Sequence, residues 1–201
     1  MTTAAKVALI DYGMGNIHSA GKALECAGAR VVLAETPDQL KNCDRIFLPG
    51  VGGIRACIDP LCERGFDEAL ALSDKPLLAV CVGMQLLFEH SEENGGTQGL
   101  GMLPGRVSRF ASAEDLCIPH IGWNRVRTDA HPLWDGLPQE PWFYFVHSYR
   151  VAASPSAQGR CDYGGEFVAA AGESRIFAVQ FHPEKSQAVG LRLLRNFIRW
   201  G

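Results

Sequence analysis

PLLAVCVGMQ, residues 76–85, is the stretch of the 201-residue chain that decides its fold. Its first seven residues are apolar throughout, without the alternating polar positions of a half-exposed strand, and predict a central strand covered on both faces. The strand leads into an expected helix at residues 84–92, with Cys81 at the junction and Gly83 two residues later. A buried strand that runs straight into a helix is typical of α/β proteins with a parallel sheet.

The residues before this stretch alternate short β-type runs with amphipathic segments. The expected strands cover residues 6–11, 30–34 and 45–50, and the expected helices cover residues 16–27, 37–41 and 54–72. This order is that of βαβ units, whose strands form one parallel sheet.

The residues after it have a different pattern, with Gly, Pro and aromatic clusters between strand-like pieces. Those pieces cover residues 105–110, 123–128, 142–152 and 166–172, and they are followed by a strand at 175–182 and a helix at 187–200. We therefore expect an α/β fold with an open, mostly parallel central sheet, helices on both faces, and antiparallel strands in the C-terminal half. Residues 1–201 are expected to form a single domain.

The composition excludes several classes of protein. With 47% hydrophobic and 20% charged residues and a net charge of −3, the chain is expected to be globular, with no affinity for nucleic acid. Its seven cysteines are odd in number and contain no CxxC pair, which argues against a disulfide framework or a zinc site and favours the cytoplasm. The sequence shows neither an export signal nor a membrane span.

The junction at residues 79–85 has the pattern of a nucleophile elbow with Cys81 in the place of serine. The turn would lift the sulfur out of the sheet, Gly83 would let the helix approach the strand, and the Val82 N–H would point at a developing oxyanion. A helix N-terminus also lowers a thiol pKa. On this pattern alone, Cys81 could equally be a small core residue.

QFHPEKS, residues 180–186, supplies partners for such a thiol. In an extended backbone His182 and Glu184 point the same way, so Glu184 can orient the imidazole that takes the Cys81 proton. Alone, His182 could be a surface histidine beside a solvated glutamate. Finding nucleophile, base and orienting group together favours the catalytic interpretation.

Two glycine-rich loops follow expected strands. FLPGVGG, residues 47–53, exposes backbone N–H groups and could supply a second oxyanion donor, or could be an ordinary turn. DYGMGN, residues 11–16, is not a dinucleotide fingerprint, because His18 stands where the third glycine is needed. We expect no nicotinamide or flavin cofactor and no metal.

Together these motifs resemble the class I, or triad, glutamine amidotransferases, over nearly the whole chain, and this resemblance implies a flavodoxin-like fold. DYGMGN, LPGVG, CVGMQLLFEHSEE, PHIGWN (119–124), YFVHSY (144–149) and FHPEKS resemble, more narrowly, the glutaminase subunits of imidazole glycerol phosphate synthase, an enzyme of histidine biosynthesis. One position departs from the family pattern: Ala79 stands where a glycine is usual.

The resemblance implies roles for individual residues. Cys81 would be the nucleophile, His182 the general base and acid, and Glu184 the orienting carboxylate. The oxyanion hole would be formed by the backbone of Val51, Gly52 and Val82. Glutamine would be held by Gln85, Glu93, Ser148 and Tyr149, and the face toward the synthase partner would include Tyr12, Asn16, Trp123, Tyr144 and Lys185.

The implied reaction is hydrolysis of L-glutamine to glutamate and ammonia. A cyclase partner, expected to be a TIM barrel in a heterodimer, would use that ammonia to make imidazole glycerol phosphate and an aminoimidazole carboxamide ribonucleotide. Three alternatives remain: another triad glutaminase, serving for example vitamin B6 or aminodeoxychorismate synthesis; a cysteine hydrolase or peptidase; and a noncatalytic subunit with a vestigial triad. DYGMGN and PHIGWN argue against the first, and the intact triad argues against the last.

Overall fold

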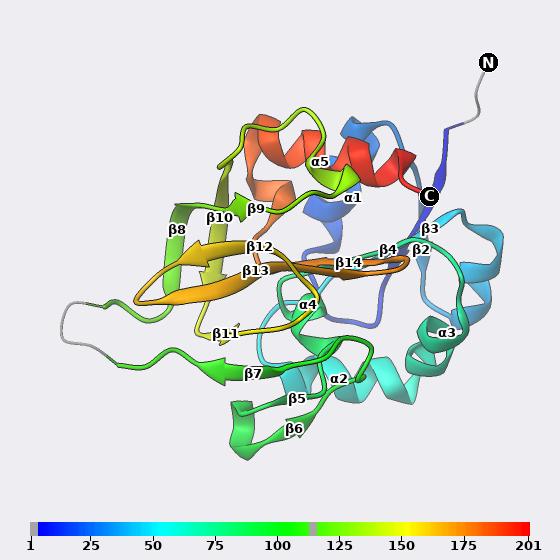
Figure 1. Ribbon diagram of the computed structural model, residues 1–201. Helices are drawn as coiled ribbons and strands as arrows, with labels where there is room; N and C mark the ends of the chain where they lie inside the picture. The colour runs from blue at the N-terminus through cyan, green and yellow to red at the C-terminus, as the bar shows by residue number, and fades with distance from the viewer. Residues whose placement is uncertain (1–3, 113–115) are drawn as a thin grey trace.

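The computed structural model describes residues 4–112 and 116–201, in which one twelve-stranded sheet contains strands from both halves of the chain (Figure 1). Its parallel part has the strand order β2-β1-β3-β4-β14. These strands are β1 (Lys6–Ile10), β2 (Arg30–Ala34), β3 (Arg45–Leu48), β4 (Leu77–Val80) and β14 (Ile176–Val179). Every residue of β4 is buried, so the prediction of a central strand is confirmed. The order is that of a flavodoxin-like sheet.

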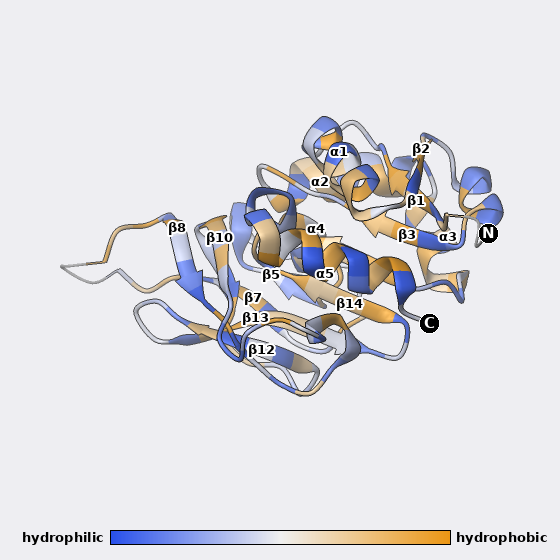
Figure 2. Ribbon diagram, turned by 90° about the horizontal axis from the view of Figure 1, so that it is seen from above, coloured by the Kyte–Doolittle hydropathy of each residue, from blue (hydrophilic) through white to orange (hydrophobic). Residues whose placement is uncertain are grey.

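Helices cover both faces of the parallel strands (Figure 1). One face carries α1 (Ile17–Ala27) and α5 (Gln187–Arg199), and the other carries α2 (Ile54–Glu63), α3 (Phe66–Leu72) and α4 (Val82–Leu86). Figure 2 shows α5 with hydrophilic and hydrophobic bands, as expected of an amphipathic helix against a sheet. None of the helices within the described residues is long and apolar enough to cross a bilayer.

The C-terminal half extends the sheet mainly by antiparallel pairing, as predicted. β13 (Glu166–Glu173) lies beside β14, and the sheet continues through β11 (Tyr149–Val151), β7 (Arg106–Arg109), β5 (His90–Ser91) and β6 (Thr97–Gln98), with β12 (Ala157–Asp162) and β9 (Arg127–Thr128) as a branch. A separate antiparallel ribbon joins β8 (His120–Arg125) to β10 (Trp142–His147). Short 3₁₀ helices η1 to η4 cover Pro37–Asn42, Glu93–Gly95, Pro132–Trp134 and Pro183–Lys185.

The single helix expected at residues 54–72 is wrong, because the structure has two helices there. Helix α2 ends at Glu63, and Gly65 takes a left-handed backbone conformation with φ +75° before α3 begins. A left-handed residue cannot continue an α-helix, and glycine adopts it at no steric cost. Apolar residues keep the spacing of a helix on both sides of this break, so the sequence pattern did not indicate that the helix is interrupted.

The helix expected at residues 84–92 is also wrong, since α4 ends at Leu86. The carbonyls of Leu86, Leu87 and Phe88 accept hydrogen bonds from the backbone of residues 100–103 instead of from a further helical turn. Met84, Leu87 and Phe88 are fully buried, so their apolar character reflects burial in the core and does not indicate a longer helix. A distant loop therefore terminates this helix.

Two glycines let α4 begin directly against the preceding loop. A Cβ on Gly83 would lie 2.4 Å from the Leu48 carbonyl oxygen, and one on Gly50 would lie 2.4 Å from the Gly83 nitrogen. Ala79, the departure from the family pattern, is fully buried and pairs with Leu48 and Ala178, so its methyl group fits within the sheet. The close contact brings the glycine-rich loop beside Cys81.

Candidate active site

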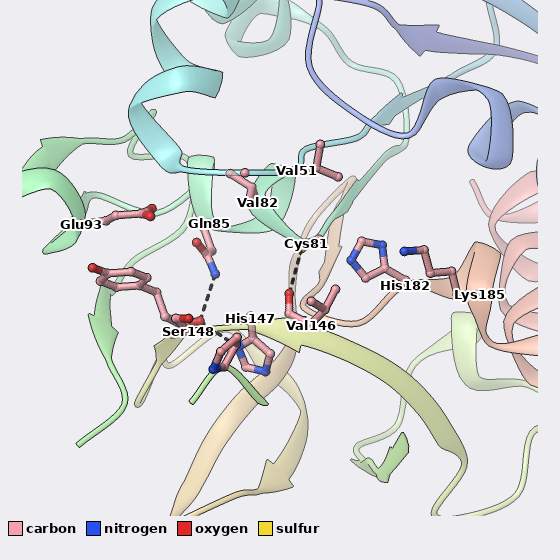
Figure 3. A pocket seen from close by; sticks show the side chains of 13 residues that line it. Val51, Cys81, Val82, Gln85, Glu93, Val146, His147, Ser148, His182 and Lys185 are labelled. Carbon is pink, nitrogen blue, oxygen red and sulfur yellow. Dashed lines mark hydrogen bonds between the residues drawn. The ribbon is translucent and has the colours of Figure 1, made fainter. Parts of the chain in front are cut away.

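A pocket of about 430 Å³ lies beyond the carboxyl ends of β4 and β14 (Figure 3). Apart from Glu184, every residue predicted to be catalytic, to form the oxyanion hole or to hold substrate lines this pocket. Parallel α/β sheets bind ligands at this edge. The fold thus brings together side chains from the 47–53 loop, α4, β11 and the end of β14.

Cys81 occupies a strained turn between β4 and α4. Its φ of 56° is unusual for a residue other than glycine, and such strain is typical of nucleophile elbows. Its N–H donates to the Val179 carbonyl at 2.8 Å, which extends the pairing with β14, while its carbonyl accepts from Met84 at the start of the helix. The thiol lies 4.0 Å from the Val146 carbonyl oxygen. Figure 3 shows Cys81 between Gln85 and His182.

His182 and Glu184 form a buried pair. Nδ1 of His182 lies 2.7 Å from Oε1 of Glu184, and both side chains are at least 96% buried. This burial excludes the alternative of a surface histidine beside a solvated glutamate. Nε2 of His182 has no hydrogen-bond partner among the described residues, so it is available to the Cys81 thiol.

The electrostatics of this pair favour a charged imidazole. Burial alone would lower the pKa of His182, but interactions with Cys81 and Glu184 outweigh it and raise the pKa to about 10. A protonated ring can give its proton to a group that leaves from a carbon bound to the adjacent sulfur. The geometry can therefore support covalent catalysis by cysteine.

The glycine-rich loop presents unpaired backbone donors. No hydrogen bond within the described residues uses the N–H groups of Val51, Gly52 or Val82. The carbonyls of the loop are held from its other side: the Tyr12 hydroxyl donates to Pro49 O at 2.8 Å, and the Cys57 thiol donates to Val51 O at 3.3 Å.

The prediction that Tyr12 belongs to a partner face is wrong for its side chain, which is only 1% exposed. Its ring packs in the core, and its hydroxyl holds the Pro49 carbonyl of the glycine-rich loop. Burial of the phenol raises its pKa well above the ordinary value, so it stays neutral and donates this bond. Tyr12 therefore supports the glycine-rich loop from inside the core.

The predicted substrate residues form the wall opposite His182 (Figure 3). The Gln85 amide nitrogen donates to the Tyr149 carbonyl at 3.0 Å and to Gln180 Oε1 at 2.9 Å. Glu93 accepts a 2.8 Å bond from the Ile54 N–H, at the start of α2. These bonds fix the orientation of groups that line the pocket.

Three other residues of the predicted partner face lie on or near the outer surface beside the pocket. Trp123 packs edge-on against Tyr144 with ring centroids 6.1 Å apart, and the Lys185 ammonium lies 5.8 Å from the Tyr144 ring centroid. Asn16 lies at the N-terminus of α1, where its Oδ1 accepts from the Ser19 N–H, and it lines a small cavity together with His182 and Glu184.

Sequence reasoning missed several residues of this site. His147 lines the pocket and bonds to buried His120, and Gln180 orients Gln85. Ser186 accepts from the Tyr144 N–H and donates to the His182 carbonyl, tying β10 to the catalytic loop. All lie within the motifs PHIGWN, YFVHSY and QFHPEKS, and their place as polar residues inside those motifs was the available signal. The described residues contain no group of three or more His, Cys, Asp or Glu side chains that could hold a metal ion.

The chain is similar to known proteins over nearly its whole length. A family model described as glutamine amidotransferase class-I matches residues 8–200. The chain is 52% identical over 208 aligned residues to the imidazole glycerol phosphate synthase subunit HisH of Methylococcus capsulatus, with 96% of each chain covered. It is 48% identical to the subunit of the same name from Acinetobacter baylyi, with 97% and 98% covered.

Similar solved structures support the fold. A putative GMP synthase protein from Thermoplasma acidophilum superposes with a TM-score of 0.77 at 20% identity, covering 99% of this chain and 94% of the other. A structure described as a glutamine amidotransferase gives a TM-score of 0.72 at 18% identity, covering 96% and 97%.

Proposed function

Because this chain belongs to the class I glutamine amidotransferases, and within them to the HisH glutaminase subunits of imidazole glycerol phosphate synthase, we propose that Cys81, His182 and Glu184 are its catalytic triad. The triad would hydrolyse L-glutamine to glutamate and ammonia. One observation carries the proposal: the strained, buried thiol lies in one pocket with an imidazole whose other nitrogen bonds to a buried carboxylate.

The reaction begins when the Cys81 thiolate attacks the carboxamide carbon of glutamine. The negative charge that develops on the amide oxygen is met by the unpaired N–H groups at Val51, Gly52 and Val82. His182 gives its proton to the leaving nitrogen, ammonia departs, and a γ-glutamyl thioester remains on the sulfur. Water, deprotonated by His182, then attacks the thioester and releases glutamate and the Cys81 thiolate, with the proton retained on His182.

Glutamine would lie along the wall formed by Gln85, Glu93, Ser148 and Tyr149. The pocket volume is sufficient for an amino acid. The Glu93 carboxylate suits an ammonium group, and the oriented Gln85 amide and the backbone at Ser148 and Tyr149 offer hydrogen bonds to the rest of the substrate.

The ammonia would pass to a cyclase partner in a heterodimer. Ammonia in neutral water is largely protonated and loses its nucleophilic lone pair, which favours transfer between covered sites. The β8–β10 ribbon, which also carries the pocket residue Val146, exposes three large apolar side chains; they are Ile121, which pairs with Val146, Trp123 and Trp142. A TIM-barrel cyclase docked there would cover the site and complete the synthesis of imidazole glycerol phosphate in histidine biosynthesis.

The deciding experiment compares Cys81→Ala with the wild type and with a Cys26→Ala control, which removes an exposed thiol far along the sequence. In complex with the cyclase, Cys81→Ala should lose glutamine-dependent synthesis by roughly 1000-fold or more yet retain synthesis from ammonium salts. Cys26→Ala should match the wild type in both. Retained glutamine hydrolysis in Cys81→Ala would overturn the assignment.

A further inference from the structure

Two buried histidines have no part in the proposed chemistry. His120 and His147 lie opposite each other on β8 and β10, and both are more than 90% buried. Nδ1 of His120 lies 2.9 Å from Nε2 of His147. Histidine pairs at this distance bond only if one nitrogen carries a proton and the other does not, so their protonation states are tied together.

The surrounding groups determine those states. The Tyr149 carbonyl can only accept, so the 2.8 Å contact requires a proton on Nδ1 of His147. Nε2 of His147 then accepts from Nδ1–H of His120. Nε2 of His120 in turn accepts from the Asn124 amide at 3.4 Å, whose nitrogen also donates to Asp162 O while its oxygen accepts from Arg125 N–H. Both rings are thus neutral Nδ1–H tautomers.

The environment supports neutral rings. His120 is stacked between Phe145 and Tyr163, with ring centroids 4.8 Å and 3.9 Å away. Burial lowers the pKa of His120 to about 4 and, aided by the positive potential of His182 and Arg150, lowers that of His147 to about 3. A charge on either ring would lose one of the bonds described above.

The hydrogen bonds that run from Asn124 through His120 and His147 end at the Tyr149 carbonyl, which is part of the pocket wall. The Tyr149 carbonyl receives both His147 Nδ1–H and the Gln85 amide, so both of its lone pairs are used. Gln85 is thereby turned in one direction, and the backbone at Ser148 and Tyr149 is held. Because these groups form the substrate wall, a shift in their position would weaken glutamine binding more than it would slow the reaction at Cys81.

We propose that Asn124, His120 and His147, together with the Tyr149 carbonyl, form a histidine network that positions the glutamine-binding wall. The inference rests on the proposed function and adds His120 and His147 to it as positioning residues. Neither touches the reacting atoms. The competing explanation is that the two rings only fill space between β8, β10 and their aromatic neighbours.

Two substitutions separate these explanations. His120→Asn retains an amide donor near the position of Nδ1 but loses the ring, whereas His120→Phe retains a stacking ring but loses both nitrogens. The network predicts that His120→Phe raises KM for glutamine about 10-fold, with kcat within about 3-fold, because it leaves a buried His147 nitrogen unpaired. His120→Asn should raise KM less. Packing alone predicts the reverse order, and a KM in His120→Asn equal to or above that of His120→Phe would overturn the proposal.

A second measurement needs no turnover. Nitrogen-15 NMR of the full-length wild-type chain, with its histidines assigned, should show neutral Nδ1–H rings at His120 and His147 from pH 5.5 to 8. His131 is the internal contrast, since its Nδ1 accepts from the Leu133 N–H and its proton must be on Nε2. A protonated ring or an Nε2–H tautomer at His120 or His147 would overturn the network. Failure of glutaminase activity would leave this result unaffected, so the two proposals fail separately.

Discussion

Oε1 of Glu184 lies 2.7 Å from Nδ1 of His182, while Nε2 of the same ring has no partner among the described residues. One side of the imidazole is thus held by a buried carboxylate, and the other is available to the thiol. The carboxylate does two things: it orients the ring, and it helps keep the ring protonated against the cost of burial.

Glu184→Gln should separate those two effects. The amide can still bond to the ring, but it carries no charge, and we expect kcat for glutamine hydrolysis to fall roughly 100-fold or more with KM nearly unchanged. The pKa of His182, followed by NMR, should fall as well. Glu63→Gln, an exposed carboxylate, is the matched control. A variant at position 184 with near-normal kcat would show that the charge is not needed.

The contact between Gly50 and Gly83 predicts a loss of stability. A Cβ at Gly50 would meet the Gly83 nitrogen at 2.4 Å, and neither backbone segment can move without displacing Cys81 or the loop. Gly50→Ala should lower the free energy of unfolding by about 2–4 kcal/mol, measured by urea denaturation. Gly21→Ala in α1, where the nearest atom lies at 3.6 Å, should instead be neutral or stabilising by up to about 1 kcal/mol. Equal effects at the two positions would contradict the steric argument.

Whether a feature of this structure can be predicted from the sequence depends on whether residues close together in the sequence cause it. The β4 strand and the turn at Cys81 are encoded in consecutive residues, and both were predicted. The end of α4 depends on hydrogen bonds from residues 100–103, which no local pattern reports. Burial of Tyr12 and pairing of His120 with His147 depend on which strands become neighbours, so the motifs that contain them could be found while the positions of their side chains could not.

Tyr12 and Cys57 should influence catalysis from behind the glycine-rich loop. They hold the carbonyls of Pro49 and Val51, and these bonds orient the peptides on the pocket side. Tyr12→Phe and Cys57→Ala should each lower kcat several-fold, up to about 10-fold, at saturating glutamine, and each should cost about 1 kcal/mol of stability.

Cys161→Ala is the control for this pair of substitutions. It also removes a buried thiol, but one whose sulfur lies against the Asp162 carbonyl and not against the glycine-rich loop, so it should cost stability without changing kcat. If Tyr12→Phe and Cys57→Ala behaved as Cys161→Ala does, the carbonyl bonds would be structural only.

Acid should destabilise the fold through His120 and His147. Their folded pKa values of about 4 and 3 lie below the unfolded value near 6.5, so the unfolded chain binds protons first as the pH falls. The contribution of these two rings to stability is complete well above pH 6.5 and should fall by about 2–3 kcal/mol in total between pH 7 and pH 5.5. His182 has the opposite sign, because its pKa is raised to about 10 and its contribution is lost only as the pH rises toward that value.

Urea denaturation at pH 7, 6.5, 5.5 and 5 measures this acid loss. His18→Asn, which removes an exposed histidine, should leave the curve unchanged, whereas His147→Asn should flatten it. A wild-type curve that is level from pH 7 to 5 would contradict neutral burial of the pair.

The exposed aromatic face of the β8–β10 ribbon predicts where the synthase partner docks. Trp123 is 43% exposed, packs against Tyr144 and lies on the ribbon that carries Val146 to the pocket, so a partner that receives ammonia would cover it. Trp123→Ala should weaken binding to the cyclase about 10-fold or more in titration calorimetry, as expected of a central aromatic side chain in an interface. Leu72→Ala removes a side chain that is 87% exposed on α3 and should leave the affinity unchanged.

Intrinsic glutamine hydrolysis by the free Trp123→Ala protein should stay within about 2-fold of wild type, since the indole lines no part of the pocket. Unchanged affinity in Trp123→Ala would show that the partner docks elsewhere than on the ribbon, and that ammonia leaves by a different route.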